Sequence, residues 1–281
     1  MTPARLTLQS TRLLSSGAKI PLIGLGTYLI EPGKQTEDAV LWALHAGYRH
    51  IDTASLYRNE ASVGNAIRQS GIPREKIFVT TKLFNNDHGY DKALAACNLS
   101  LQKLGLDYID LYLIHSPKPG PELRAESWKA LETLVEQGKV KSIGVSNYGV
   151  AHLKELLASN PRIKPAVNQV EIHPWLTRND IVKYSEEHGI AIEAYSPLSH
   201  GRRLQDPTVI KIGEQYNKSA AQVLIRWSLQ RGHVVLPKSI HKERIEQNAD
   251  VYDFELSEED VKILDHLNDN FVSGWDPTVS K

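Results

Sequence analysis

Four residues able to hold or transfer a proton stand at or just after the ends of extended apolar runs. "HIDTASLYRNE" (50–60) puts Asp52 at the end of one run and Tyr57 five residues later. Lys82 ends "IFVTTK" (77–82), and His115 ends "YIDLYLIH" (108–115). Each alone is more often an ordinary polar group at a strand end, where the chain meets water. Only convergence of the four in space would indicate chemistry.

If these side chains are neighbours, their types suit proton donation. Lys82 beside Tyr57 would favour the phenolate and lower a tyrosine pKa that normally lies near about 10. Asp52 would keep Lys82 charged and oriented, as a partly buried ammonium requires. A tyrosine tuned in this way is a plausible general acid near neutral pH. His115 would donate a hydrogen bond to a substrate oxygen.

The chain alternates short apolar runs with longer stretches at helical spacing, and glycines follow six of the helical stretches as helix stops. Eight such β-then-α units favour a (β/α)8 TIM barrel, in the α/β class, over a doubly wound sheet. In that barrel the four side chains meet at the face formed by the C-terminal strand ends. Strands are expected at 20–26, 48–52, 77–82, 108–115, 140–146, 166–172, 190–196 and 233–237. Helices are expected at 36–47, 59–71, 90–105, 125–138, 150–158, 179–189, 219–232 and 242–250.

Two segments lie outside the eight units. Residues 6–20 read as a β-hairpin around Ser16-Gly17, and residues 256–268 as an additional C-terminal helix. Ser257 and Asp260 resemble a capping pair at the start of that helix. No linker or repeat interrupts the pattern, so residues 1–281 are expected to form a single domain.

Composition excludes several classes of protein. The 281 residues carry 33 basic and 33 acidic side chains, so no overall field attracts nucleic acid or an anionic membrane. The single cysteine, Cys97, excludes an intrachain disulfide and lies on the apolar face of a helix, so it is expected in the core. With neither a secretory signal nor a membrane span, a cytoplasmic protein is expected.

Three ordered regions resemble the aldo-keto reductase family, and the resemblance runs from Pro21 to about residue 270. They are "GYRHIDTASLYRNE" (47–60), "DLYLIHSP" (110–117) with "GKVKSIGVSN" (138–147), and "VLPKSIHKERIEQN" (235–248). The resemblance implies the catalytic tetrad Asp52, Tyr57, Lys82 and His115. The short tail and "IHSP" look like the microbial branch, with its diketogluconate-reductase-like and prostaglandin-F-synthase-like members.

The glycines of "GLGTYL" (24–29) are no dinucleotide fingerprint, because the third glycine is missing and no helix follows at once. The resemblance instead implies NADPH, or NADP+, lying extended across the barrel mouth, with Gly26 and Thr27 at a tight turn beside it. It places Ser146, Asn147, Gln169 and Tyr195 at the nicotinamide, Ser196 and Leu198 at the pyrophosphate, Lys238, Ser239 and Arg244 at the 2′-phosphate, and Gln247 and Asn248 near the adenine. His241 and Gln247 differ from the residues common in the family, so NADP is the expected preference and use of NAD stays open.

The same resemblance implies which residues form the substrate pocket. Tyr28, Phe84 and Ser116 occupy positions where the family often has larger aromatics, Trp175 is expected as an apolar wall, and Trp275 as a lid. The short tail after Asn270 suggests an open, shallow pocket with broad carbonyl specificity. His173 is read as structural because no metal-binding spacing exists. Residues 118–126 are read as a loop with Arg124 as a surface charge.

The expected function is NADPH-dependent reduction of aldehydes or ketones by hydride transfer, with Tyr57 as proton donor. The expected partner is a small carbonyl substrate, with no nucleic acid or membrane, and the protein is expected as a monomer or weak dimer. One alternative is a regulatory barrel that holds cofactor but turns over slowly, like the potassium-channel β subunits. Another is an isomerase or aldolase in which Lys82 forms a Schiff base, although an Asp52 partner would keep that lysine protonated.

Overall fold

The computed structural model describes residues 6–280, and its centre is a barrel of eight parallel strands. The order β10-β9-β8-β7-β6-β5-β4-β3 follows the chain, and all neighbouring pairs are parallel. The two edges meet at a parallel bridge between Ile23 and Val235, where Gly24 N–H donates to Val235 O at 2.9 Å. The predicted (β/α)8 barrel is therefore confirmed. Its strands are β3 (Leu25–Gly26), β4 (His50–Asp52), β5 (Phe78–Leu83), β6 (Ile109–Ile114), β7 (Val140–Ser146), β8 (Val167–Glu171), β9 (Ala191–Tyr195) and β10 (Val234–Leu236).

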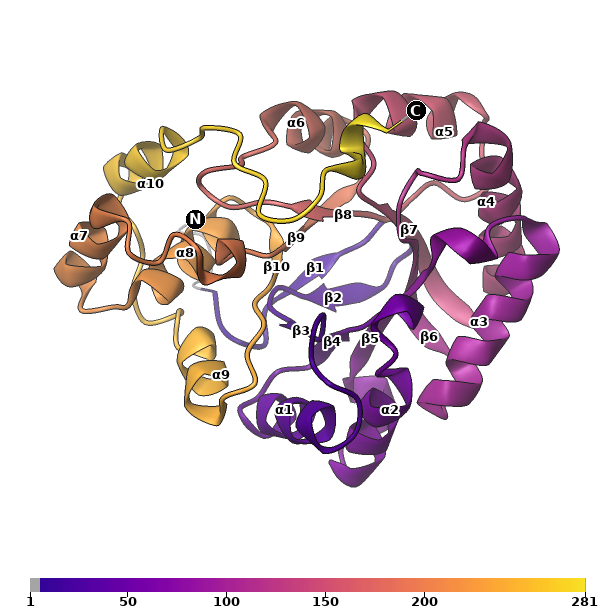
Figure 1. Ribbon diagram of the computed structural model, residues 1–281, viewed down its shortest axis with the longest axis horizontal. Coiled ribbons are helices and arrows are strands. Elements are labelled where there is room, and N and C mark those ends of the chain that lie inside the picture. The colour runs from indigo at the N-terminus through magenta and orange to yellow at the C-terminus, as the bar shows by residue number, and fades with distance from the viewer. Residues whose placement is uncertain (1–5, 281) are drawn as a thin grey trace.

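Helices surround this barrel, as Figure 1 shows in a view along its axis. Their bounds are α1 (Lys34–His45), α2 (Glu60–Gln69), α3 (Tyr90–Leu104), α4 (Pro121–Glu136), α5 (Val150–Ala158), α6 (Asn179–Glu187), α7 (Pro207–Tyr216), α8 (Ala220–Gln230), α9 (Lys242–Ala249) and α10 (Glu258–Asp265). The sequence pattern predicted all but α7, which lies in the insertion after β9. An Asp206 side chain caps α7 by accepting from Thr208 N–H and Val209 N–H. No helix in residues 6–280 is long and apolar enough to cross a membrane.

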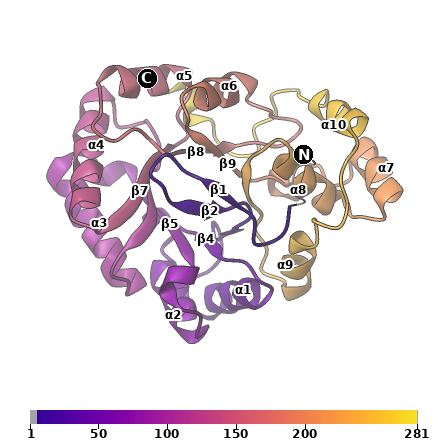
Figure 2. The ribbon, with the colours of Figure 1, turned by 180° about the vertical axis from the view of Figure 1, so that it is seen from behind.

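The predicted hairpin closes one end of the barrel. Strands β1 (Thr11–Leu13) and β2 (Lys19–Pro21) pair antiparallel and lie across the barrel end that faces the viewer in Figure 2. The Ser16 hydroxyl at its turn lies 2.7 Å from the Ser142 hydroxyl of β7. The expectation of one strand over 20–26 is wrong, because β2 ends at Pro21 and a separate strand, β3, enters the barrel.

Helix α4 corrects a second expectation, since residues 121–126 are helical. Pro121 occupies the first turn, where its missing N–H costs nothing. Arg124 is buried and not a surface charge: its guanidinium contacts both carboxylate oxygens of Glu155, with Nη2 2.7 Å from Oε2. The pair joins α4 to α5, a contact between segments that no local pattern predicts.

The last residues cross the opposite end of the barrel from the hairpin. Helix α10 begins as predicted, with Asp260 N–H donating to the Ser257 hydroxyl at 3.1 Å. The following tail is tied down by an ion pair between Arg178 Nη2 and Asp276 Oδ1 at 2.9 Å. In Figure 1 this yellow segment passes over the barrel mouth in front of β8 and β9. The tail therefore borders whatever binds there.

Helices α2 and α3 touch where α2 carries a glycine. A Cβ built on Gly64 would lie 1.9 Å from the backbone oxygen of Leu104. We expect Gly64→Ala to lower the free energy of unfolding by about 1–3 kcal/mol or more, because the helices must separate. Urea denaturation measures it. Gly274→Ala, whose Cβ would meet no atom within 4 Å, is the matched control and should leave stability unchanged.

Candidate active site

Lys82 is the fixed centre of the four residues, which the structure brings together at one end of the barrel. Its fully buried Nζ donates to Asp52 Oδ1 at 2.7 Å, to Asp52 Oδ2 at 2.8 Å and to Thr53 O at 2.9 Å. The Tyr57 hydroxyl is its fourth neighbour, at 3.3 Å. Because β4 and β5 are paired in the sheet, the lysine and its carboxylate are held by the barrel wall itself.

Tyr57 reaches this centre from a single helical turn, Ser55–Tyr57, that follows β4. The turn is stopped by Arg58, whose φ of 60° is left-handed. The Tyr57 ring lies edge-on to His115, with centroids 5.7 Å apart, and 5.1 Å from the Tyr28 ring. The Tyr57 side chain is thus held between the Lys82 ammonium and the rings of His115 and Tyr28.

The protonation states differ from the sequence expectation for one residue. Burial, reinforced by the negative charge of Asp52, raises the pKa of Tyr57 well above its usual value. The predicted lowering by Lys82 is wrong for this structure, because burial and the negative charge of Asp52 outweigh the effect of the lysine. Burial and the Lys82 charge lower the pKa of His115 to about 3. At neutral pH the site therefore presents a protonated phenol and a neutral imidazole.

Below Asp52 the polar network continues into the barrel. Gln169 Nε2 donates to Asp52 Oδ2 at 2.8 Å and to Glu193 Oε2 at 2.6 Å. Burial raises the pKa of Asp52, against the opposing effect of Lys82. Burial and the neighbouring Asp52 raise the pKa of Glu193 to about 8. Sequence reasoning missed Glu193, whose only signal was a carboxyl in the apolar run "IAIEAY" (190–195).

Next to this network, Asn147 organises the neighbouring strand ends. Its Nδ2 donates to His115 O and to the Ser146 hydroxyl, each at 3.0 Å, and its Oδ1 accepts from the Tyr195 hydroxyl at 2.8 Å. The left-handed backbone of Asn147, with φ of 63°, lets the chain turn directly after β7. Ser146 and Tyr195 are thereby held beside His115.

A cavity of about 1340 Å³ opens above these groups. Of the residues predicted from sequence, it is lined by Gly26, Tyr28, Asp52, Tyr57, Phe84, His115, Ser146, Asn147, Gln169, Tyr195, Ser196, Leu198, Lys238, Ser239, Arg244, Gln247, Asn248 and Trp275. Lys82 and Thr27 do not line the cavity, because both side chains are buried. The Thr27 hydroxyl donates to the backbone oxygen of Asp52 at 2.9 Å. Ser116 is also buried, donating to Asn85 Oδ1 at 2.7 Å, so Asn85 and not Ser116 lines the cavity.

Trp175 corrects the expectation of an apolar pocket wall. It is 1% exposed and packs in a core cluster with α7 and α8 residues, while its indole N–H donates to Asp206. The neighbouring His173 is structural as expected, with Nε2 3.1 Å from Glu171 Oε1. Among residues 6–280 no cluster of three or more His, Cys, Asp or Glu side chains could hold a metal ion.

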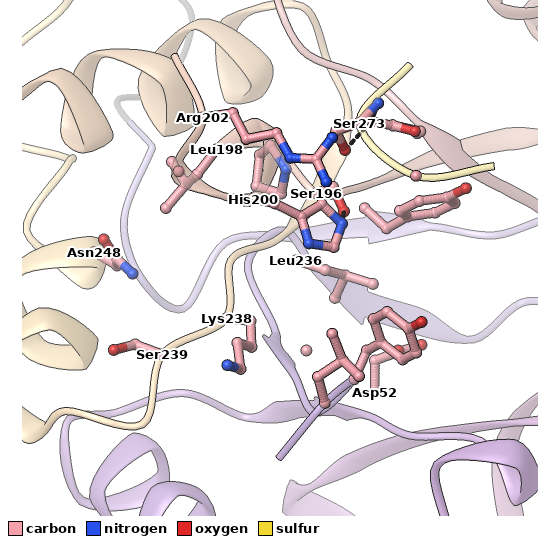
Figure 3. Close-up of a pocket in the computed structure, with 18 of the residues that line it drawn as sticks. Asp52, Ser196, Leu198, His200, Arg202, Leu236, Lys238, Ser239, Asn248 and Ser273 are labelled. Carbon is pink, nitrogen blue, oxygen red and sulfur yellow. Dashed lines mark hydrogen bonds between the residues drawn. The ribbon is translucent and has the colours of Figure 1, made fainter. Parts of the chain in front are cut away.

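One end of the cavity is cationic, and Figure 3 shows how its residues face each other. Lys238, Ser239 and Asn248 lie on the side of α9, and the Ser239 hydroxyl accepts from His241 N–H at 3.1 Å. Leu198, His200 and Arg202, from the loop after β9, lie across the cavity from them, and the Arg202 guanidinium points toward Ser273. Lys242 instead turns toward Glu246 on its own helix, at 3.9 Å. The sequence analysis did not single out His200 and Arg202, although the segment "HGRR" (200–203) carries three basic side chains.

The other end of the cavity is bordered by the tail. Trp275 is 42% exposed, and Lys118 Nζ lies 5.0 Å from its ring centroid. Ser273 N–H donates to Glu171 Oε1 at 2.8 Å, which holds the tail against β8. Burial alone would raise the pKa of Glu171, but the hydrogen bonds from His173 and Ser273 outweigh it and lower the pKa, so this carboxylate stays ionised and is already hydrogen-bonded. Glu171 and Ser273 were also missed, because only the folded tail brings them together.

Buried histidines make the protein acid-sensitive. Burial lowers the pKa of His50, His115 and His233 to about 3, and of His88 to about 4. A group with a lowered folded pKa stabilises fully above its unfolded value of 6.5 and loses that stability as pH falls toward the folded value. We expect the Tm to fall between neutral pH and about pH 5, with each such histidine contributing up to about 1.4 kcal/mol per pH unit.

Calorimetry of two variants separates this effect from general acid denaturation. His233→Leu, at a buried site outside the cavity, should flatten the dependence of Tm on pH. His45→Gln, at an exposed position, should leave it as in the wild type. An equal slope for wild type and His233→Leu would contradict the assignment.

The barrel, the buried Asp52–Lys82 pair with Tyr57 at the cavity, and the family match below define an oxidoreductase of the aldo/keto reductase type. Residues 22–269 match the aldo/keto reductase family. A glyoxal reductase of Bacillus subtilis is 47% identical over 271 residues, covering 96% of this chain and 97% of that protein. MGS-M4, an aldo-keto reductase from a deep-sea metagenome, superposes with a TM-score of 0.92 at 47% identity, covering 97% and 100% of the two chains. An aldo-keto reductase of Bombyx mori solved with NADP gives a TM-score of 0.88 at 37% identity, covering 97% and 99%.

This chain therefore belongs to the aldo/keto reductase family.

Proposed function

We propose that the protein reduces aldehydes and ketones to alcohols with NADPH, and that Asp52, Tyr57, Lys82 and His115 carry the chemistry. The observation that carries this proposal is the Tyr57 hydroxyl, which lies 3.3 Å from the buried Lys82 ammonium and lines the cavity beside His115. The family supports carbonyl reduction as the reaction type.

The residues of the cavity fit a dinucleotide phosphate. Lys238 and Arg244 offer cations on the α9 side, Arg202 offers one on the opposite side, and amide and hydroxyl groups line the middle. Gln169 uses its Nε2 inside the barrel, so its Oε1 is the atom left to accept a hydrogen bond from a carboxamide. When bound, NADPH would supply the hydride that reduces the carbonyl carbon.

The protein's own part of the reaction is proton transfer and alignment. Tyr57, protonated at neutral pH, donates its proton to the alkoxide oxygen as that oxygen gains charge. Lys82, held by Asp52, stabilises the phenolate that remains. Neutral His115 orients the carbonyl oxygen by donating a ring N–H. Such fixed donors at the site of developing charge act without reorganisation.

The substrate end of the cavity supports broad specificity. Tyr28, Leu29, Leu56 and Trp275 are exposed apolar side chains at its rim, and Phe84 lies further in. Carboxylates near this end are already committed, Asp52 to Lys82 and Glu171 to Ser273. The pocket therefore suits small and medium aldehydes and ketones with an apolar part.

A cofactor-oxidation screen tests this function. NADPH and NADH are each supplied with simple aldehydes, α-keto esters and sugars, and absorbance at the nicotinamide band is followed. We expect turnover with NADPH and at least one aldehyde. Cofactor binding without turnover would support a regulatory barrel instead. Trapping of Lys82 by borohydride with a carbonyl compound would support the Schiff-base alternative.

Arg244 tests the cofactor preference separately. Its exposed guanidinium lines the cationic end beside Ser239, so Arg244→Met should raise the Kd for NADPH about tenfold or more, the cost of losing charge-assisted hydrogen bonds. The Kd for NADH, which lacks the 2′-phosphate, should stay unchanged. Lys242→Met, whose lysine faces Glu246, is the control. Equal losses for both cofactors would exclude a 2′-phosphate contact.

A further inference from the structure

Glu193 is a buried carboxyl that the proposed reaction does not use. It lies on β9 opposite Gln169 of β8, and its side chain is fully buried. Its Oε2 accepts from Gln169 Nε2 at 2.6 Å. Its Oε1 has no hydrogen-bond partner among the described residues, and His50 Nε2 lies 3.5 Å from it.

The charged groups around Glu193 indicate the protonation state of its carboxyl. Asp52 and Glu193 both receive hydrogen bonds from the same nitrogen of Gln169, so they are close neighbours. Lys82 contacts both oxygens of Asp52 and is the one cation that acts on the two carboxyls among the described residues. Two carboxylates sharing one cation in a buried site cannot both ionise easily, and Asp52 is the one paired directly.

The other groups that face Glu193 do not change this count. His50 on β4 is neutral, because burial and Lys82 lower its pKa to about 3. Tyr57 is protonated, and the residue of β10 paired with Glu193 is the apolar Val234. The carboxyl of Glu193 is therefore neutral, in agreement with its pKa of about 8.

The side-chain amide of Gln169 keeps one orientation because Asp52 and Glu193 both accept from its Nε2. Rotating the amide by half a turn would point its Oε1 at the ionised Asp52, which has no proton to share. With Nε2 donating to both carboxyls, both of its N–H groups are used inside the barrel. The Oε1 of Gln169, a cavity-lining residue, is then the atom left for a ligand.

We propose that Glu193 is a positioning residue of the cofactor site: as a neutral carboxylic acid inside the barrel it accepts an N–H of Gln169 and so presents Gln169 Oε1 to the carboxamide of the nicotinamide cofactor. The cofactor part of this inference rests on the proposed function. Ionisation of Glu193 adds a second buried negative charge beside Asp52, so the arrangement is lost at alkaline pH.

The protonation state is tested without cofactor. A carboxyl whose folded pKa lies above its unfolded value stabilises fully below 4.5 and loses that stability as pH rises through about 8. E193Q keeps an acceptor for Gln169 and cannot ionise. Its Tm relative to the wild type should therefore rise progressively across that window. A Tm difference that is constant with pH would overturn the neutral state.

The positioning role is tested by NADPH titration of three variants. E193L removes the acceptor and should raise the Kd about tenfold or more, because a buried N–H is left unpaired. E193Q should restore the wild-type Kd at neutral pH and keep it under alkaline conditions, where the wild-type Kd rises. E60Q, at a buried carboxyl on α2 bonded to Thr81, is the matched control and should bind as the wild type.

Each outcome bears on one part of the inference. Wild-type affinity in E193L would overturn the positioning role. If E193L does not fold, the comparison of the NADPH Kd of wild type and E193Q at alkaline pH tests the positioning role. The same pH dependence of Kd in both proteins would overturn that role. A wild-type protein that binds no NADPH at any pH would contradict the proposed function, while the Tm comparison still reports the state of Glu193.

Discussion

Tyr57→Phe is expected to lower kcat/KM for aldehyde reduction by about 10²–10⁴-fold, the usual contribution of a general acid. The variant lacks the hydroxyl that lies 3.3 Å from Lys82 Nζ, and no other phenol contacts that lysine among the described residues. The ring stays, and with it the packing against His115 and Tyr28. NADPH affinity and Tm should therefore remain as in the wild type.

Steady-state kinetics and fluorescence titration on the same preparation check this result. Tyr28→Phe is the matched control, because its ring also lines the cavity 5.1 Å from Tyr57 but makes no hydrogen bond to Lys82. It should keep most of the activity. Wild-type turnover in Tyr57→Phe would exclude Tyr57 as the proton donor, and loss of NADPH binding would show a structural defect instead.

Lys82→Met is expected to have the largest effect on stability. It removes one partner of a fully buried ion pair and leaves Asp52 uncompensated, which typically costs about 3–5 kcal/mol. It also removes the cation that stabilises the Tyr57 phenolate, so reduction should be lost together with stability. Urea denaturation at neutral pH gives the free energy of unfolding.

The double variant Asp52→Asn/Lys82→Met separates charge burial from packing. Without the carboxylate no buried charge is left unpaired, so the double variant should recover part of the lost stability. Its activity should stay low, because both charged groups behind Tyr57 are gone. A double variant less stable than Lys82→Met alone would show that the ion pair is not the source of the loss.

Much of this protein could be predicted from sequence because its signals are local. Apolar runs ended by Asp52, Lys82 and His115 marked strands, and glycines marked helix ends such as Gly105, whose φ is 64°. Evenly spaced β-then-α units then implied a closed barrel, and closure implied that C-terminal strand ends meet at one face. The convergence of the four side chains follows from that topology alone.

The errors arose where distant segments meet. The family resemblance implied Trp175 as a pocket wall, but the contacts of α7 and α8 bury it. The local pattern predicts a surface charge at Arg124, since its ion-pair partner, Glu155, lies 31 positions away in the chain. The insertion after β9 hid α7 and brought His200 and Arg202 to the cavity. None of these contacts has a period or spacing in the sequence.

The sequence by itself determined the barrel, the family and the identity of the four polar residues at the strand ends. Only the tertiary structure decided their electrostatics. Burial raises the pKa of Tyr57 and the negative charge of Asp52 adds to the rise, which is the opposite of what Lys82 alone suggested. Burial also raises the pKa of Glu193 to about 8, and the pairing of β8 with β9 brings Gln169 Nε2 to its Oε2. The physical reason is that pKa depends on desolvation and on every nearby charge, which exist only once the barrel has closed.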